Sequence, residues 1–445
     1  MVTDPPAEDE DRAASPSSYA TRLLVTALLV APYLAGHRVP LPGVHPDLPT
    51  YVPLASRLTL LALGMTPLVT GFLLVELFAL ATTPGRRLRA AGVAGRGRLN
   101  RAALVTSLVL SAVQALGIAM FLETPSWQSA EPMVDAPGWP FRLLLMATLT
   151  AVTAAVFALG NLLSDYGIGN GFALLILAEV GWSSSRIWAA AREELTADNW
   201  PLSLALFAAV GLVALLVRFV WGTEETGTPP FPQGILPAQL TFAALAFPPV
   251  RSGLGGSLRV GSFAIAPLGV TLFGILLVSW LAFHLFSSRP RLAANLPETD
   301  EVLDGLAAVL RRRLVASTAV LAAGALAFLA WNAWQPNSVT AHFTFTGLVV
   351  ATMIGLDVRD QILFLSRHRR TVRLIQLDNV HLSYRLVVRL REEGIDALAR
   401  GQKLRSLTYF FGALFKIDVL VPADRHDRAR EVLAALESAP QVKVF

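Results

Sequence analysis

The stretch Asp165-Tyr166-Gly167-Ile168-Gly169-Asn170-Gly171 stands between two long apolar runs, and it decides how the chain is interpreted. Three glycines in five residues are typical of a phosphate-binding loop, but that loop needs a soluble strand before it and a helix after it. Here the flanks, residues 143–163 and 172–180, have the composition of membrane segments. We therefore predict a tight cytosolic turn between two membrane helices. Its residues are Gly167, Gly169, Asn170 and Gly171, with glycine supplying backbone freedom.

Composition indicates a multi-span membrane protein. Of the 445 residues, 54% are hydrophobic and only 16% are charged, whereas soluble domains carry about 25% charged residues. There is no cysteine, which excludes disulfides and thiolate metal sites. The seven histidines are scattered, and no nucleophile, base or paired carboxylates form a catalytic pattern. We expect no enzyme activity, no cofactor and no metal site.

Candidate spans follow from the length of apolar sequence, since a spanning helix needs about 20 residues. The short fifth and seventh segments could each be re-entrant, but loop charge alternates consistently only if both cross. The ten segments are 21–37, 57–81, 102–122, 141–163, 171–182, 201–221, 234–249, 263–286, 314–334 and 343–363.

Arginine placement predicts the orientation of these spans. Arginines cluster in the loops 82–101 and 287–313 and at the start of the tail after Ser366, which predicts that these segments are cytosolic. Both termini would then be cytosolic, and the net charge of +5 reflects topology rather than nucleic-acid binding. Residues 1–18 are expected to be a disordered acidic tail without a removable signal peptide. Five plus five spans give two halves of opposite orientation, as in an inverted repeat.

Short motifs along residues 20–365 resemble, in order and spacing, those of the SecY family, the protein-conducting channel subunit. The first span is followed by Pro40-Leu41-Pro42-Gly43. The second contains Ala62-Leu63-Gly64-Met65-Thr66-Pro67, and the seventh begins Gly234-Ile235-Leu236-Pro237. The fourth leads into the glycine turn. The resemblance implies an all-α polytopic fold over residues 19–365, with ten helices in two inverted five-helix halves.

The resemblance also implies an hourglass pore closed by a ring of apolar side chains, which excludes water by dewetting. Gln239 departs from that pattern, because an amide could hold a water and weaken the dry seal. Ordinary helix packing is the alternative for all of these positions. The matching residues are Met65, Val69, Leu175, Ile176, Gln239 and Val350.

Two further polar residues lie within predicted spans. The family opens sideways, and Gln114 would be a polar member of that lateral gate; the alternative is a static interhelical hydrogen bond. Glu76 lies inside the second span, where an ionisable side chain is costly and functional by default. It could instead sit near the cytosolic interface.

Three departures separate the chain from the family pattern. The segment 44–56 contains three prolines, which leaves little room for the plug helix that the family carries there. The link 222–233 is short and acidic, whereas the family has a long basic hairpin that docks the ribosome or a motor ATPase. The link 287–313 lacks the family's Ile-Arg-Pro-Gly element. Docking of a ribosome or motor ATPase is therefore doubtful.

The tail 371–445 changes character to an alternating strand and helix pattern. Strands are predicted at 372–377, 395–400, 414–421 and 442–445, and helices at 380–393 and 423–438. This order is that of a cytosolic ferredoxin-like domain, and it resembles small bacterial signal-transducing domains. The segment 401–412 could bind a partner, lie on the bilayer surface, or form a flexible loop.

The sequence therefore predicts a specialised SecY-like channel subunit for protein translocation or membrane insertion. The expected location is the bacterial inner membrane. The expected partners are unfolded polypeptide, lipids and small SecE-like and SecG-like subunits. The alternative is a membrane scaffold or sensor that has kept the fold and lost transport.

Overall fold

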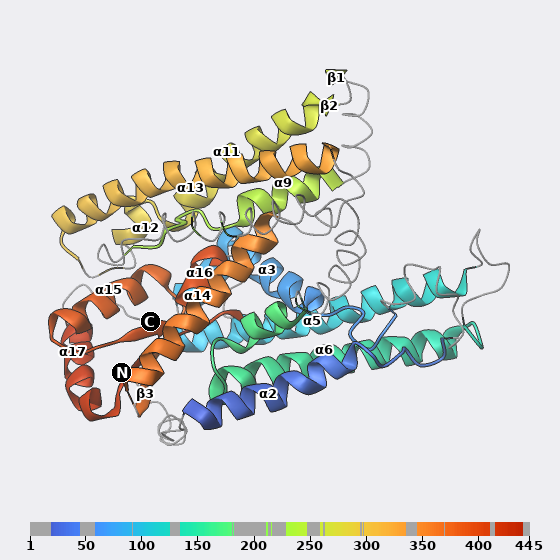
Figure 1. Ribbon diagram of the computed structural model, residues 1–445, viewed down its shortest axis with the longest axis horizontal. Helices are drawn as coiled ribbons and strands as arrows, with labels where there is room; N and C mark the ends of the chain where they lie inside the picture. Colours follow the sequence, from blue (N-terminus) through green and yellow to red (C-terminus); the bar gives the residue numbers. More distant parts are fainter. Residues whose placement is uncertain are drawn as a thin grey trace, which may run out of the picture. The chain divides into compact units, whose positions relative to one another are not determined.

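The structure is a computed structural model, shown in Figure 1, and it is mainly helical over the residues that it describes. These residues are 19–44, 58–90, 92–124, 134–179, 181, 211, 215, 228–246, 259–260, 263–293, 296, 298–334, 345–368, 370–409 and 414–438. Four predicted features lie outside the described residues. They are the acidic tail, the plug segment from residue 45, nearly all of the sixth span, and the last strand.

The chain divides into two compact units, which we call the N-terminal and C-terminal units. The N-terminal unit contains residues 18–182, with 410–415 and 445 assigned to it. The C-terminal unit contains residues 1–17, 183–409 and 416–444.

The N-terminal unit is a set of helices, apolar except for the basic α4, that pack with close backbone approaches. Its helices are α2 (Tyr19–Gly36), α3 (Thr66–Ala81), α4 (Thr83–Ala90), α5 (Gly92–Glu123), α6 (Trp139–Tyr166) and a helix over 171–179. The long helices α5 and α6 lie side by side (Figure 1), joined by a buried 2.8 Å hydrogen bond between Ser111 Oγ and Thr153 Oγ1. A methyl group on Gly71 of α3 would lie 2.7 Å from the backbone nitrogen of Ser107, so α3 and α5 pack closely there.

One end of this unit is closed by an apolar cluster. In this cluster, the segment after α2 and the segment before α3 pack against α5 and α6, and the apolar side chains of all four are buried against one another. The members are Leu41, Leu58, Ala115, Ala119, Leu122, Val134, Phe141, Leu145 and Leu149.

The C-terminal unit combines further apolar helices with a small mixed module. Its first elements are α9 (Leu236–Ala246), β1 (Arg259–Val260), β2 (Phe263–Ala264), α11 (Ile265–Phe286), α12 (Arg289–Ala293), α13 (Asp300–Trp334) and α14 (Phe345–Arg367). Helices α9 and α11 meet where Gly274 faces Thr241, because a methyl on this glycine would lie 2.6 Å from the threonine Oγ1. An apolar cluster joins α11, α12 and α13; its members are Phe283, Leu292, Leu296, Leu303, Leu306 and Leu310.

Residues 370–409 and 416–438 form what we call the C-terminal module. Its elements are β3 (Thr371–Leu377), α15 (Val380–Glu392), β4 (Leu398–Arg400), α16 (Gln402–Leu407), β5 (Ile417–Pro422), the 3₁₀ turn η5 (Ala423–Arg425) and α17 (His426–Ser438). The strands form one antiparallel sheet in the order β3-β5-β4. Asn379 begins α15 by accepting the Leu382 N–H at 3.2 Å.

Several sequence predictions need correction. The strand predicted at 395–400 covers only Leu398–Arg400, and the strand predicted from 414 begins at Ile417. The flexible-loop interpretation of 401–412 is wrong for its first half, which contains α16 and is buried. The predicted loops 82–101 and 287–313 are largely helical, because their leucine, alanine and arginine residues favour helix.

Within the described residues, four helices are long and apolar enough to cross a membrane. They are Gly95–Glu123, Trp139–Tyr166, Leu268–Ala293 and Asp300–Ala330. The pair α3 and α4, bent by 104° at Thr82, adds a fifth if it is counted as one broken span. Several apolar helices are therefore present, while the full count of ten spans stays a prediction.

Candidate functional site

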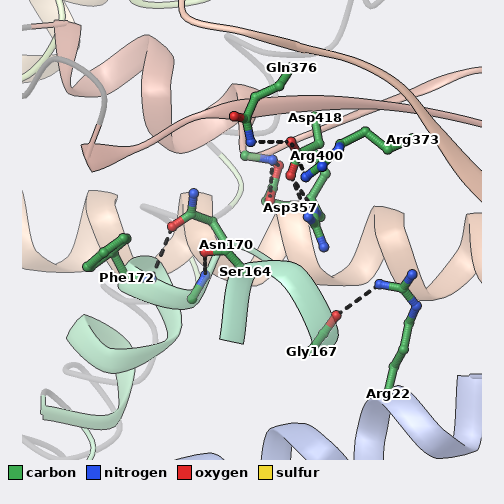
Figure 2. Close-up of polar contacts among 12 residues, drawn as sticks. Arg22, Ser164, Gly167, Asn170, Phe172, Asp357, Arg373, Gln376, Arg400 and Asp418 are labelled. Carbon is green, nitrogen blue, oxygen red and sulfur yellow. Dashed lines mark hydrogen bonds and ion pairs between the residues drawn. The ribbon is translucent and has the colours of Figure 1, made fainter. Parts of the chain in front are cut away.

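The glycine turn links α6 to the helix 171–179 and is buried. Gly167 follows the end of α6, where its N–H donates to the Leu163 carbonyl at 2.9 Å. Its own carbonyl accepts a 3.3 Å hydrogen bond from Arg22 Nη1 of α2 (Figure 2). Gly169 has φ +77°, the left-handed conformation that glycine adopts readily. A tight turn between two helices therefore stands here, and its cytosolic placement stays a prediction.

Asn170 and Ser164 accept hydrogen bonds from the backbone N–H groups that a bound phosphate would need. Asn170 Oδ1 accepts the N–H groups of Phe172 and Ala173 at 3.1 and 3.2 Å, which makes it the N-cap of the following helix. Ser164 Oγ accepts the Gly171 N–H at 2.9 Å (Figure 2). These three donors are already paired, so the turn is built to start a helix rather than to bind an anion.

Four of the candidate ring residues lie in the N-terminal unit. Met65 is buried at the N-cap of α3, and Val69 is half-buried one turn into that helix. Leu175 is fully buried in the helix 171–179, and Ile176 beside it is half-buried. This burial is compatible with both a closed ring and ordinary packing.

Glu179 is a polar residue of this region that the sequence analysis did not single out. Its carboxylate accepts a 3.3 Å hydrogen bond from Tyr33 Oη of α2 and another from the backbone N–H of Met65. Gly64 leaves room for it, because a methyl there would lie 2.6 Å from Glu179 Oε1. Glu179 therefore ties the helix that carries Leu175 to the start of α3. The sequence feature that could have identified Glu179 is a single carboxylate inside an otherwise apolar segment.

The remaining candidates are distributed over other helices. Gln239 is half-buried on α9, and Val350 is half-buried on α14. Gln114 is half-buried on α5, and its side-chain oxygen has no hydrogen-bond partner among the described residues. The roles of these three residues stay predictions.

Glu76 is buried near the end of α3 and forms an ion pair with Arg89 of α4. The sharp bend between the two helices brings the arginine back toward the glutamate. The carboxylate is therefore compensated locally, which favours the interfacial interpretation of this residue.

The C-terminal module contains a buried charge cluster on its sheet (Figure 2). Arg400 of β4 pairs with Asp418 of β5, and both are 4% exposed. Gln376 Nε2 of β3 donates to Asp418 Oδ1 at 2.8 Å. Burial alone would raise the pKa of Asp418, but Arg400 and its hydrogen bonds outweigh that effect and hold the pKa below its ordinary value. The aspartate is therefore ionised and links all three strands.

His381 of α15 is the second buried ionisable group of the module. Its Nε2 lies 3.3 Å from Ser287 Oγ, just after α11, and its ring stacks on Tyr409. Burial lowers the pKa of His381 to about 4, opposed in part by a hydrogen bond to the Phe286 backbone. The imidazole is therefore neutral at physiological pH.

No metal site is found in the part of the chain that the structure describes, since no three His, Asp or Glu side chains lie close enough together there.

Comparison with known proteins identifies relatives in one family. Residues 59–225 match the SecY family model. Protein translocase subunit SecY of Aquifex aeolicus is 27% identical over 208 residues, covering 42% of this chain and 48% of the relative. SecY of Rickettsia bellii is 31% identical over 121 residues, covering 27% and 28%. SecY of Streptococcus gordonii is 24% identical over 343 residues, covering 64% and 77%.

The match to the Aquifex relative spans about half of that protein's length. The solved structure of a protein conducting channel aligns with 81% of this chain and 96% of its own, at 13% identity and a TM-score of 0.46. Sec61 from the canine ribosome-channel complex gives the same coverage, with 12% identity and a TM-score of 0.49. On the family model and the sequence relatives, this chain is similar to SecY-family proteins and resembles a divergent member of that family.

Proposed function

We propose that this protein is a SecY-type channel subunit that translocates unfolded polypeptide or inserts it into the bacterial inner membrane. The observation that carries the proposal is the SecY match over residues 59–225, which includes the glycine turn and the segment with Met65. No enzymatic step is part of the proposal. Conduction needs only a path that opens for a polypeptide and closes to ions.

The finer parts of the proposal follow the family pattern. Ten spans form two inverted five-helix halves, and both termini are cytosolic. The ring is formed by Met65, Val69, Leu175, Ile176, Gln239 and Val350, and Gln114 belongs to the lateral gate. Small SecE-like and SecG-like subunits are the expected membrane partners.

The C-terminal module is proposed to be a ferredoxin-like domain. The sheet order β3-β5-β4 supports this, because the third strand lies between the first two and is antiparallel to both. That arrangement is a split β-α-β unit. The fourth strand, predicted at 442–445, lies outside the described residues.

The proposed docking properties differ from those of the family. The start of the predicted seventh span and the segment between predicted spans eight and nine contact the module, through Ile235 to Leu407 and through Glu298 to Arg385. A surface that is occupied by the chain's own module is less open to a ribosome or motor ATPase. We therefore propose that this subunit works with altered cytosolic partners.

Site-specific crosslinking tests the channel proposal. The chain has no cysteine, so a single Met65→Cys or Val350→Cys substitution gives one unique thiol. A translocation intermediate stalled in membranes and carrying a thiol-reactive probe should crosslink to both variants. The matched controls are Leu74→Cys on α3 and Leu363→Cys on α14, which are exposed in this structure. Equal crosslinking of ring and control positions, or none at either ring position, would contradict the proposal.

A further inference from the structure

The segment Gly401–Tyr409 is buried along its whole length although it carries two basic side chains. Lys403 and Arg405 are 8% and 5% exposed. Arg405 Nη1 donates to the backbone carbonyls of Thr408 and Tyr409, at 2.8 and 3.1 Å. Buried charges of this kind need fixed partners, so the position of α16 is closely specified.

The first end of α16 is fixed to α14. Both carboxylate oxygens of Asp357 accept the Gly401 N–H, at 3.0 and 2.9 Å, and the carboxylate also accepts the Lys403 N–H. Gly401 permits this because its φ is +79°. One turn further along α14, Asp360 forms an ion pair with the Lys403 side chain.

The other end of α16 is fixed to the start of α9. The Ile235 N–H donates to the Leu407 carbonyl at 2.9 Å. A methyl on Gly234 would lie 2.8 Å from that same carbonyl oxygen, so the two backbones approach each other closely. The short helix therefore bridges two apolar helices that are far apart in the sequence.

The bridged positions are related to the candidate ring residues by helical spacing. Gln239 follows Ile235 by one turn of α9, and Val350 precedes Asp357 by two turns of α14. Residues four or seven apart lie on the same face of a helix. A displacement of α16 would therefore be transmitted to the helix faces that carry Gln239 and Val350.

Neighbouring contacts hold the whole module in this position. Arg385 of α15 donates to Glu298 Oε1 through both Nε and Nη2, at 2.9 and 2.7 Å. The Tyr409 ring stacks on Phe286 of α11, with centroids 5.2 Å apart. Ser287 Oγ, just after α11, lies 3.3 Å from His381 Nε2 of α15 in the same region.

We propose that α16 is a clamp through which the C-terminal module holds α9 and α14 in one relative position, so that the module has to lift before these helices rearrange. The role of the clamp in transport rests on the proposed function. The mechanical coupling between α14 and α9 through α16 is independent of transport and can be measured directly.

Hydrogen–deuterium exchange of the full-length protein in lipid nanodiscs tests the coupling. Lys403→Glu removes the contact to Asp360 on α14, and we expect the Ile235 amide to exchange about tenfold faster, as for the loss of a charged hydrogen bond. The charge swap, Lys403→Glu with Asp360→Lys, should restore slow exchange. Asp357→Asn provides a second, nearly isosteric variant with the same expected direction.

The control is Arg425→Glu on η5, an exposed arginine of the same module. It should leave exchange at Ile235 unchanged. Unchanged exchange in both Lys403→Glu and Asp357→Asn, or equally fast exchange in the control, would overturn the clamp.

A thiol lock tests the consequence for transport. Asp360→Cys with Lys403→Cys, joined by a short reducible bifunctional reagent, fixes α16 to α14 in a chain that has no other cysteine. We expect polypeptide transport to fall at least about tenfold when locked and to recover on reduction. Equal transport in both states would overturn the requirement that the module lifts. Absence of transport in the unmodified protein would contradict the proposed function, and the exchange experiment would still decide the clamp.

Discussion

Replacing Gly171 by alanine should destabilise the N-terminal unit, because the turn leaves no space for a side chain. A methyl at this position would lie within contact distance of the Gly160 carbonyl oxygen, 2.6 Å from Leu163 Cβ and 2.7 Å from the Ser164 backbone nitrogen. Two of these neighbours are backbone atoms of α6, which cannot rotate away. Overpacking of this kind costs about 1–3 kcal/mol. A cost of about 2 kcal/mol, relieved as the turn opens, would speed unfolding up to about thirtyfold.

The assay is the half-life of the detergent-solubilised, full-length protein at a fixed elevated temperature, followed by size-exclusion chromatography. A rate is the suitable quantity because large membrane proteins unfold irreversibly. The matched control is Gly117→Ala on α5, where a methyl would meet nothing within 4 Å. That variant should be neutral or slightly stabilised, since alanine favours helix over glycine by about 1 kcal/mol. Equal half-lives for the two variants would refute the close approach inferred at Gly171.

Three further predictions concern polar groups that are buried or half-buried. Glu179→Gln should shorten the same thermal half-life by roughly tenfold, because a neutral amide caps α3 more weakly than a carboxylate; an unchanged half-life would contradict its capping role. Arg400→Met should destabilise the module by about 3–5 kcal/mol, because it leaves the buried Asp418 without its ion-pair partner. The protease sensitivity of the full chain should rise in this variant and fall again in the double variant with Asp418→Asn. The folded-state pKa of His381 is about 4, below its unfolded value of about 6.5. Its contribution to the stability of the folded module is therefore complete above pH 6.5 and is lost as pH falls toward 4. Amide exchange around Ser287 should therefore rise from pH 7.5 to pH 5 after correction for intrinsic rates, and His381→Gln should remove most of that pH dependence.

Local sequence signals predicted those parts of the structure that depend on neighbouring residues. Glycine at 169 marks a left-handed turn, and the observed φ of +77° is that conformation. In the tail, apolar periodicity predicted the strands β3, β4 and β5 and the helices α15 and α17 in their observed order, but it did not predict α16. The strand ends were less accurate, because pairing partners set them: β4 pairs with β5 only over Leu398–Arg400.

The contacts of α16 could not be predicted in the same way. Lys403 and Arg405 favour a solvated loop when their sequence neighbours alone are considered. Their burial depends on Asp360, which lies 43 residues away, and on backbone carbonyls that are positioned only once the helix forms. Long-range partners of this kind leave no local pattern, so a buried basic helix and an exposed basic loop share one sequence signature.

Glu179 in the N-terminal unit and α16 in the C-terminal unit each form a polar link between two helices. In the N-terminal unit, the Glu179 carboxylate joins the helix that carries Leu175 to the amide that begins α3. In the C-terminal unit, α16 joins the start of α9 to α14. Each link is polar, buried or half-buried, and placed at a helix end, where unpaired backbone groups are available. Helices joined in this way resist sliding past one another, because displacement would leave a charged or backbone group without its partner. We therefore expect the candidate ring residues within each unit to move together, with release of α16 as the step that frees α9 from α14.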